Sequence, residues 1–101
     1  MLQNKITFVT GANRGIGLSI ARKFAKNGAI VYANARKSGS LDSLQSENFG
    51  GGSIIPIYFD ATDRSKTREA FIKIKEEHGK LDCLVNNAGI LRDKSFHKIS
   101  I

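Results

Sequence analysis

The chain has 101 residues, of which 41% are hydrophobic, and a formal net charge of +7. This length suits one domain, or one half of a larger doubly wound domain, and supplies enough apolar side chains for a core. The single cysteine, Cys83, excludes an intrachain disulfide, argues against a structural zinc site and fits a reducing compartment.

The distribution of charged and apolar residues bears on whether the chain binds nucleic acid or a membrane. Lysine and arginine are spread along the chain, mostly at positions that fit outer helix faces, and no reading helix or aromatic stacking platform accompanies them. This pattern favours a solvated helix surface over a nucleic-acid footprint. The first residues lack the apolar core of a signal peptide, and no segment approaches the ~18 apolar residues of a membrane span. We therefore expect a soluble, cytoplasmic protein without a nucleic-acid or membrane partner.

Apolar segments of strand length alternate with helical patterns along the whole chain, which is typical of βαβ units and a parallel sheet. The pattern predicts, in chain order, a strand at 6–10, a helix at 15–27, a strand at 29–35, a short helix around 41–47, a strand at 54–59, a helix from 63 to 78 and a strand at 81–85. The predicted fold class is α/β, a Rossmann-like parallel sheet with flanking helices that is incomplete after the fourth strand.

Individual residues predict how these helices and strands pack, begin or lie in the sheet. In the first helix, Ile16, Ile20 and Phe24 recur at a spacing of four residues, which predicts an apolar face. Asp63 is expected to cap the last helix, because its carboxylate can accept a hydrogen bond from the first turn. Pro56 lacks an N–H group and predicts that the third strand lies at an edge of the sheet.

The most informative segment joins the first strand to the first helix and reads Thr-Gly-Ala-Asn-Arg-Gly-Ile-Gly over residues 10–17. The first turn of a helix offers unpaired N–H groups and a positive dipole end to a pyrophosphate. Gly11 is expected to make the tight turn, Gly15 to let the backbone approach the phosphates, and Gly17 to pack the helix closely on the strand. The spacing differs from G-x-G-x-x-G. A glycine-rich turn that only reverses the chain is the alternative.

Together with two further motifs, this loop resembles the short-chain dehydrogenase/reductase family. The other motifs are Asp60, directly after the third strand, and Asn-Asn-Ala-Gly at 86–89, after the fourth. The resemblance implies that the glycine loop holds a dinucleotide pyrophosphate, that Asp60 and Ala61 meet the adenine, and that residues 87–89 lie beside the nicotinamide ribose. It also implies that Asn86 ties the last strand to its neighbour. A polar turn after a strand is the other interpretation of 86–89.

The end of the second strand bears on the choice of cofactor. An acid there would bind a free ribose 2′-hydroxyl, whereas arginine accommodates a 2′-phosphate. The chain has Arg36 at this place, no acid within residues 1–35, and a second basic residue, Arg14, in the glycine loop. NADP(H) is therefore favoured over NAD, although Arg36 and Lys37 also fit ordinary solvated loop residues. The candidate cofactor-binding residues are Gly11, Asn13, Arg14, Gly15, Ile16, Gly17, Arg36, Asp60, Ala61, Asn87, Ala88 and Gly89.

Family members use a tyrosine, with a lysine four residues later, to protonate the carbonyl oxygen as hydride arrives. Here the only tyrosines are Tyr32 and Tyr58, both in predicted strands, and Tyr32 stands roughly 13 Å from Arg36 in an extended strand. We therefore name no catalytic residue. The prediction is a single NAD(P)-binding half-domain over residues 1–101, truncated before the catalytic segment and inactive alone.

Two functional hypotheses follow. The first is an NADP(H)-dependent oxidoreductase that reduces carbonyls or oxidises alcohols, with 3-oxoacyl thioesters as one substrate class because residues 87–93 are similar to that branch of the family. The second is a non-catalytic nucleotide-binding or interaction fragment, or a degenerate gene product. Since the last strand would expose an unpaired edge, we expect the chain to be marginally stable alone, and a homo-oligomer or docking to a complementary chain is a further expectation.

Overall fold

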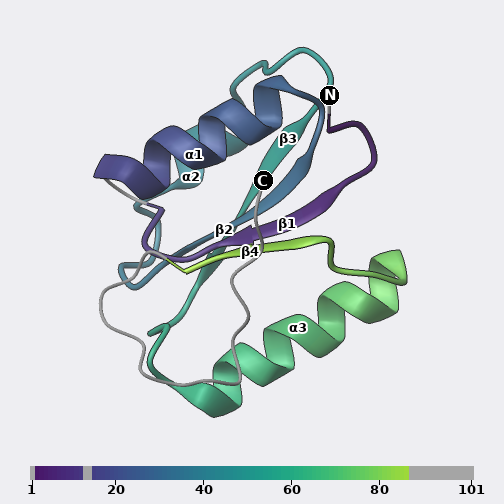
Figure 1. The fold of residues 1–101 in the computed structure, drawn as a ribbon. Helices are drawn as coiled ribbons and strands as arrows, with labels where there is room; N and C mark the ends of the chain where they lie inside the picture. Colours follow the sequence, from purple (N-terminus) through teal and green to yellow (C-terminus); the bar gives the residue numbers. More distant parts are fainter. Residues whose placement is uncertain (1, 13–14, 87–101) are drawn as a thin grey trace.

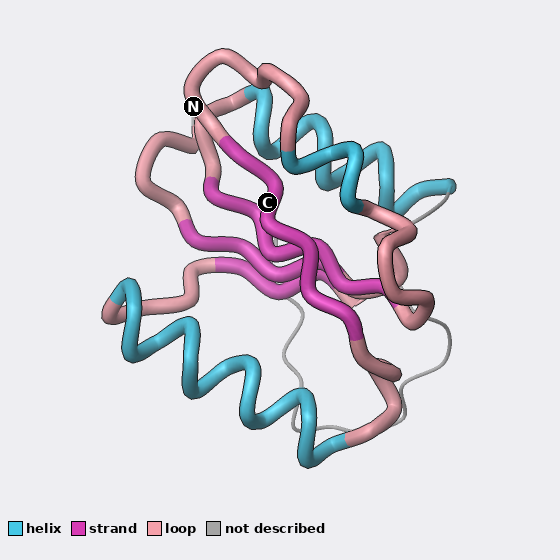
Figure 2. The backbone as a smooth tube through the Cα atoms, turned by 180° about the vertical axis from the view of Figure 1, so that it is seen from behind, coloured by secondary structure: helices cyan, strands magenta, loops and turns pink. Residues whose placement is uncertain are grey.

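The computed structural model describes residues 2–12 and 15–86. Four parallel strands form one sheet in the order β3-β2-β1-β4 (Figure 1). Helices α1 and α2 cover one face of the sheet and α3 covers the other (Figure 2). This arrangement confirms the predicted Rossmann-like α/β class. The elements are β1 Ile6–Val9, α1 Gly15–Lys26, β2 Ile30–Ala35, α2 Asp42–Gln45, β3 Ser53–Tyr58, α3 Arg64–His78 and β4 Cys83–Val85.

Both faces of the central strands are buried, which is why their sequences are apolar almost throughout. All four residues of β1 are buried, and they contribute alternately to the two layers. Val9 belongs to the cluster under α1, whereas Phe8 packs against the α3 layer and meets the Phe71 ring edge-on at 5.2 Å. Cys83 is also buried.

The first helix contacts the sheet through a stripe of mostly small residues, Gly17, Ala21, Phe24 and Ala25. Ile16, predicted to share the apolar face, is instead 69% exposed, so that part of the prediction is wrong. The reason is helical geometry, because Ile16 is rotated about 100° from Gly17 and the small residues set which side approaches the sheet.

The third helix has the boundaries that its capping residues predict. The Asp63 carboxylate accepts a hydrogen bond from the Lys66 N–H at 3.1 Å, which confirms the N-cap. Gly79 ends the helix in the left-handed conformation, with φ of 78°, and donates to the Lys75 carbonyl. Pro56 lies in β3, which pairs with β2 alone among the residues described, and the predicted edge position is thereby confirmed.

The last strand begins at Cys83, two residues later than predicted, and Asp82, just before it, is bonded to the start of β1 in two ways. The Asp82 N–H donates to the Ile6 carbonyl at 2.8 Å, and its carboxylate accepts from the Ile6 N–H at 2.7 Å. This reciprocal pair fixes the start of β1 to the segment that enters β4. The Ile6 hydrogen bond is the main cause that lowers the pKa of Asp82, with Lys80 adding to it.

Candidate functional site

The parallel arrangement brings the carboxyl ends of all four strands to one edge of the sheet, where ligands bind in open α/β folds. The segments that follow the strands carry Gly11, Arg36, Asp60 and Asn86. The structure therefore places the predicted site residues it describes along a single edge. Five predicted site residues lie outside the described residues, namely Asn13, Arg14, Asn87, Ala88 and Gly89.

Gly11 and Gly15, which lie on either side of residues 13–14 between β1 and α1, have the backbone conformation expected of glycine. Gly11 and Gly15 have positive φ angles of 60° and 56°, a region that costs other residues free energy. A Cβ atom on Gly15 would meet nothing within 4 Å, so conformation rather than space requires glycine there. Gly17 is buried in α1, as expected for close packing of helix and strand. Gly15 is the first residue of α1, and the amino end of a helix offers backbone N–H groups to an anion.

Asp60 and Ala61 form a tight turn between β3 and α3. Asp60 accepts two hydrogen bonds at Oδ1, from the Thr62 N–H at 2.9 Å and from the Thr62 hydroxyl at 2.7 Å. These bonds are the main causes that lower the pKa of Asp60, and the charge of Arg36 adds to them. Asp60 is therefore a carboxylate at neutral pH, and Ala61 is buried beside it.

Arg36 follows β2 directly, and its Nε atom lies 3.8 Å from Oδ2 of Asp60. The Arg36 side chain is 81% exposed, so this ion pair is loose and contributes little to stability. A guanidinium held this loosely is available to an anion that offers better geometry, such as a phosphate. Arg36 and Asp60 are 24 positions apart in the sequence, and the pairing of β2 with β3 brings them together.

At the other end of this edge, Thr10 joins β1 to the end of β4. Its N–H donates to the Val85 carbonyl at 3.0 Å, and its hydroxyl lies 3.3 Å from Oδ1 of Asn86. The predicted role of Asn86, tying the last strand to its neighbour, agrees with this contact.

One residue near the site, Asn34, was not singled out by the sequence analysis. Asn34 in β2 is 1% exposed. Its side-chain amide donates to the backbone carbonyls of Ile57 and Phe59, and its backbone carbonyl accepts from the Ala12 N–H. Asn34 thereby links the glycine loop to the end of β3. A polar residue within an otherwise apolar strand was the available signal. Tyr58, which the sequence placed in a strand, has its hydroxyl bound to Leu41 and Asp42, at the start of α2, and not to a reacting group.

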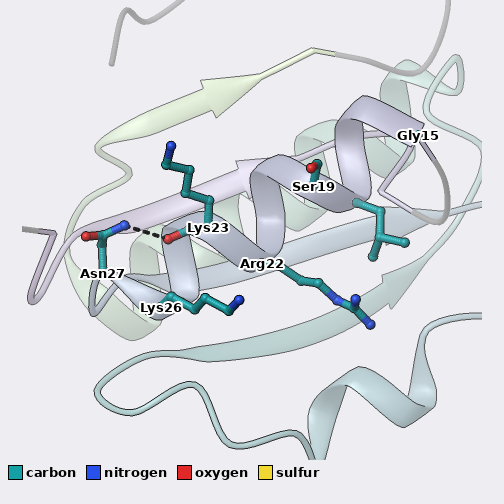
Figure 3. Close-up of a pocket in the computed structure, with 7 residues that line it drawn as sticks. Gly15, Ser19, Arg22, Lys23, Lys26 and Asn27 are labelled. Atoms are coloured by element: carbon teal, nitrogen blue, oxygen red, sulfur yellow. Dashed lines mark hydrogen bonds between the residues drawn. The ribbon is translucent and has the colours of Figure 1, made fainter.

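A surface hollow of about 570 Å³ lies on the outer side of α1 (Figure 3) and is lined by Gly15, Leu18, Ser19, Arg22, Lys23, Lys26 and Asn27. Only Gly15 belongs also to the predicted site. The Arg22 and Lys23 side chains diverge from the helix, and Arg22 is paired with Glu47 at 3.0 Å. The hollow is therefore the flank of a solvated helix and does not converge on one ligand.

The described part of the chain holds no group of three or more histidine, cysteine or acidic residues that could bind a metal ion. Within residues 2–12 and 15–86, no helix has the length and apolar character needed to cross a bilayer.

Comparison with known proteins identifies relatives of this arrangement. Residues 5–101 match the family model described as short chain dehydrogenase. The chain is 41% identical to the 3-oxoacyl-[acyl-carrier-protein] reductase FabG of Thermotoga maritima over 93 residues, which cover 91% of this chain and 38% of that enzyme. It is 42% identical to the 7alpha-hydroxysteroid dehydrogenase of Paraclostridium sordellii over 89 residues, or 87% of this chain and 33% of that enzyme.

Solved structures give the same result. A short chain dehydrogenase from Burkholderia cenocepacia J2315 in complex with NADP matches with a TM-score of 0.75 and 40% identity, covering 90% of this chain and 38% of that one. A metagenomic short-chain oxidoreductase in complex with NADP matches with a TM-score of 0.79 and 35% identity, covering 88% and 41%.

The chain thus spans less than half the length of these relatives. The match nevertheless runs through the described strands and helices and includes all three sequence motifs. The chain belongs to the short-chain dehydrogenase family.

Proposed function

We propose that this chain is the NADP(H)-binding half-domain, residues 1–101, of a short-chain oxidoreductase. The observation that carries the cofactor preference is the exposed guanidinium of Arg36, placed directly after β2 at the sheet edge that also holds the glycine loop. A bidentate guanidinium suits a 2′-phosphate, which distinguishes NADP from NAD. The two matching structures that contain NADP support the same choice.

The rest of the edge fits the other parts of a dinucleotide. The positive-φ glycines Gly11 and Gly15, with the amino end of α1, offer a cradle for the pyrophosphate. Asp60 and Ala61 are assigned to the adenine, and Asn87, Ala88 and Gly89 to the nicotinamide ribose. Asn13, Arg14, Ile16 and Gly17 complete the assigned loop. When bound, the cofactor supplies or accepts a hydride at its nicotinamide ring.

The reaction of the whole protein is proposed as carbonyl reduction or alcohol oxidation. The named relatives differ, one being a reductase of 3-oxoacyl groups on a carrier protein and one a hydroxysteroid dehydrogenase. Because both are similar to this cofactor half at nearly equal identity, substrate choice is assigned to the rest of the protein. The 3-oxoacyl thioester remains our specific proposal. Docking to a complementary chain or to a second copy is proposed as a further partner interaction.

The described tyrosines do not offer the acid that this chemistry requires. The Tyr32 hydroxyl lies 2.7 Å from Nε2 of His78, in the α3 layer, and the Tyr58 hydroxyl is bound to Asp42. We therefore propose that these residues alone bind the cofactor without catalysing hydride transfer. Measurable NADPH oxidation by the purified chain with an acetoacetyl thioester would refute this part of the proposal.

Arg36→Gln tests the cofactor assignment. Loss of a charge-assisted contact should raise the Kd for NADPH by about tenfold or more and leave the Kd for NADH nearly unchanged. Lys26→Gln is the matched control, because it removes the same charge from the far end of α1. Fluorescence titration with both nucleotides gives the four constants. Tighter binding of NADH than of NADPH by the parent chain, or equal losses for both nucleotides in Arg36→Gln, would overturn the assignment.

The alternative, a non-catalytic nucleotide-binding or interaction fragment, predicts the same binding constants. The two hypotheses differ in what happens when a segment that carries the tyrosine and lysine is co-expressed with the chain. If the chain is a non-catalytic fragment, this co-expression restores no turnover. Recovered NADPH oxidation in that complex would reject the alternative.

A further inference from the structure

The loop that carries Arg36 is held in place by one residue of the neighbouring strand. Residues 36–40 connect β2 to Leu41 and α2, and Tyr58 contacts both ends of this connection. Its backbone is paired with Ala35, the residue before Arg36. Its side-chain hydroxyl accepts a hydrogen bond from the Leu41 N–H at 2.8 Å.

The same hydroxyl also donates to Oδ1 of Asp42 at 2.6 Å, so its donor and its acceptor are the two consecutive residues that follow the loop. Partial desolvation is the first cause that raises the pKa of Tyr58, followed by the hydrogen bond to Asp42. The phenol therefore stays protonated and able to donate at all pH values near neutrality. Leu41 itself is 2% exposed and anchors the end of the loop in the core.

Between these anchors the loop is short and internally bonded. Both the N–H and the hydroxyl of Ser40 donate to the Lys37 carbonyl, at 3.1 and 2.8 Å. The Asp42 N–H donates to the Gly39 carbonyl at 3.2 Å, and Gly39 has a φ of 85° that favours glycine. A five-residue connection closed in this way has few alternative conformations while its anchors hold.

We infer that Tyr58, through Leu41 and Asp42, is a positioning residue for cofactor selectivity: it holds the 36–40 loop where Arg36 meets the 2′-phosphate. The inference rests on the proposed NADP(H) site and deepens it. Tyr58 does not touch the nucleotide in this scheme. Without its hydroxyl the loop samples other conformations, and apparent affinity falls in proportion to the fraction of molecules that remain competent.

Tyr58→Phe tests this inference, because it removes the hydroxyl and keeps the ring. We expect the NADPH-over-NADH preference to fall about two- to tenfold, the effect of one or two hydrogen bonds, and the Leu41 amide to exchange faster with solvent. Tyr32→Phe is the matched control, since it deletes a bonded hydroxyl on the α3 side of the same sheet. It should leave the preference unchanged even if it lowers stability equally.

Asp42→Asn separates geometry from charge, because it keeps an oxygen acceptor for Tyr58 while it removes a negative charge near the loop. We expect it to retain the NADPH preference or to increase it. An unchanged preference in Tyr58→Phe, or an equal loss of affinity for both nucleotides, would overturn the inference while leaving the proposed function intact. A parent chain with no preference for NADPH would overturn both.

Discussion

Gly52, at the entrance to β3, provides a stringent test of how the connection after α2 packs on the helix layer. A Cβ atom at this position would lie 2.2 Å from the carbonyl oxygen of Ala25, in α1, and 2.4 Å from that of Ala29. Both contacts are with backbone, which cannot rotate away as a flexible side chain can. Gly51, one residue earlier, would place its Cβ 3.7 Å from the nearest atom, an ordinary contact.

The expected magnitude follows from these distances. In Gly52→Ala the added carbon would lie roughly 1 Å or more inside ordinary contact, so the end of α1 and the start of β3 must separate. Overpacking of this kind costs about 3 kcal/mol, at the upper end of the usual range, and a chain of this length would lose about 12 °C or more in Tm. Gly51→Ala should change the free energy of unfolding by less than about 1 kcal/mol.

Urea and thermal unfolding followed by far-UV circular dichroism would measure both variants against the parent chain. The comparison controls for composition and location, because the two substitutions are identical and adjacent. If Gly52→Ala unfolds within about 0.5 kcal/mol of Gly51→Ala, the close approach of β3 to α1 is not as described. The same scan tests the expected marginal stability of the isolated chain, which a strongly cooperative transition would contradict.

Two further predictions concern side chains that fix the α3 and β4 layer. Asp63→Ala should lower the free energy of unfolding by about 1 kcal/mol, because the Lys66 N–H loses its cap, whereas Asp63→Asn should nearly restore it; equal urea midpoints for all three forms would refute the cap. The pKa of Asp82 is lowered from 3.8 in the folded chain, first by the Ile6 hydrogen bond, so its stabilisation is present above pH 3.8 and is lost as pH falls through the lower folded value. Asp82→Asn should therefore flatten the dependence of stability on pH in that range, as followed by urea unfolding at several pH values, and an unchanged slope would contradict this assignment.

Features that depend only on residues close together in the sequence could be predicted from the sequence. The alternation of apolar segments indicated the α/β class, and Asp63 indicated the start of α3, because capping acts within one turn. Pro56 indicated an edge strand, since a missing N–H cannot serve a strand on both sides. The glycine loop was also local, and Gly11 and Gly15 have the positive φ angles that such a turn requires.

The tertiary structure alone decided which distant groups meet. Arg36 faces Asp60, Tyr58 holds Leu41 and Asp42, and Asp82 completes the start of β1, all through the register of parallel strands. The tertiary structure also left Ile16 exposed, because the mostly small residues of α1 are the ones that pack against the sheet. Local patterns cannot fix these contacts, since strand register and helix rotation are set by the packing of the whole sheet. The sequence by itself thus indicated the family, the order of the elements and the candidate cofactor motifs, while the fold decided how the loop that carries Arg36 is held.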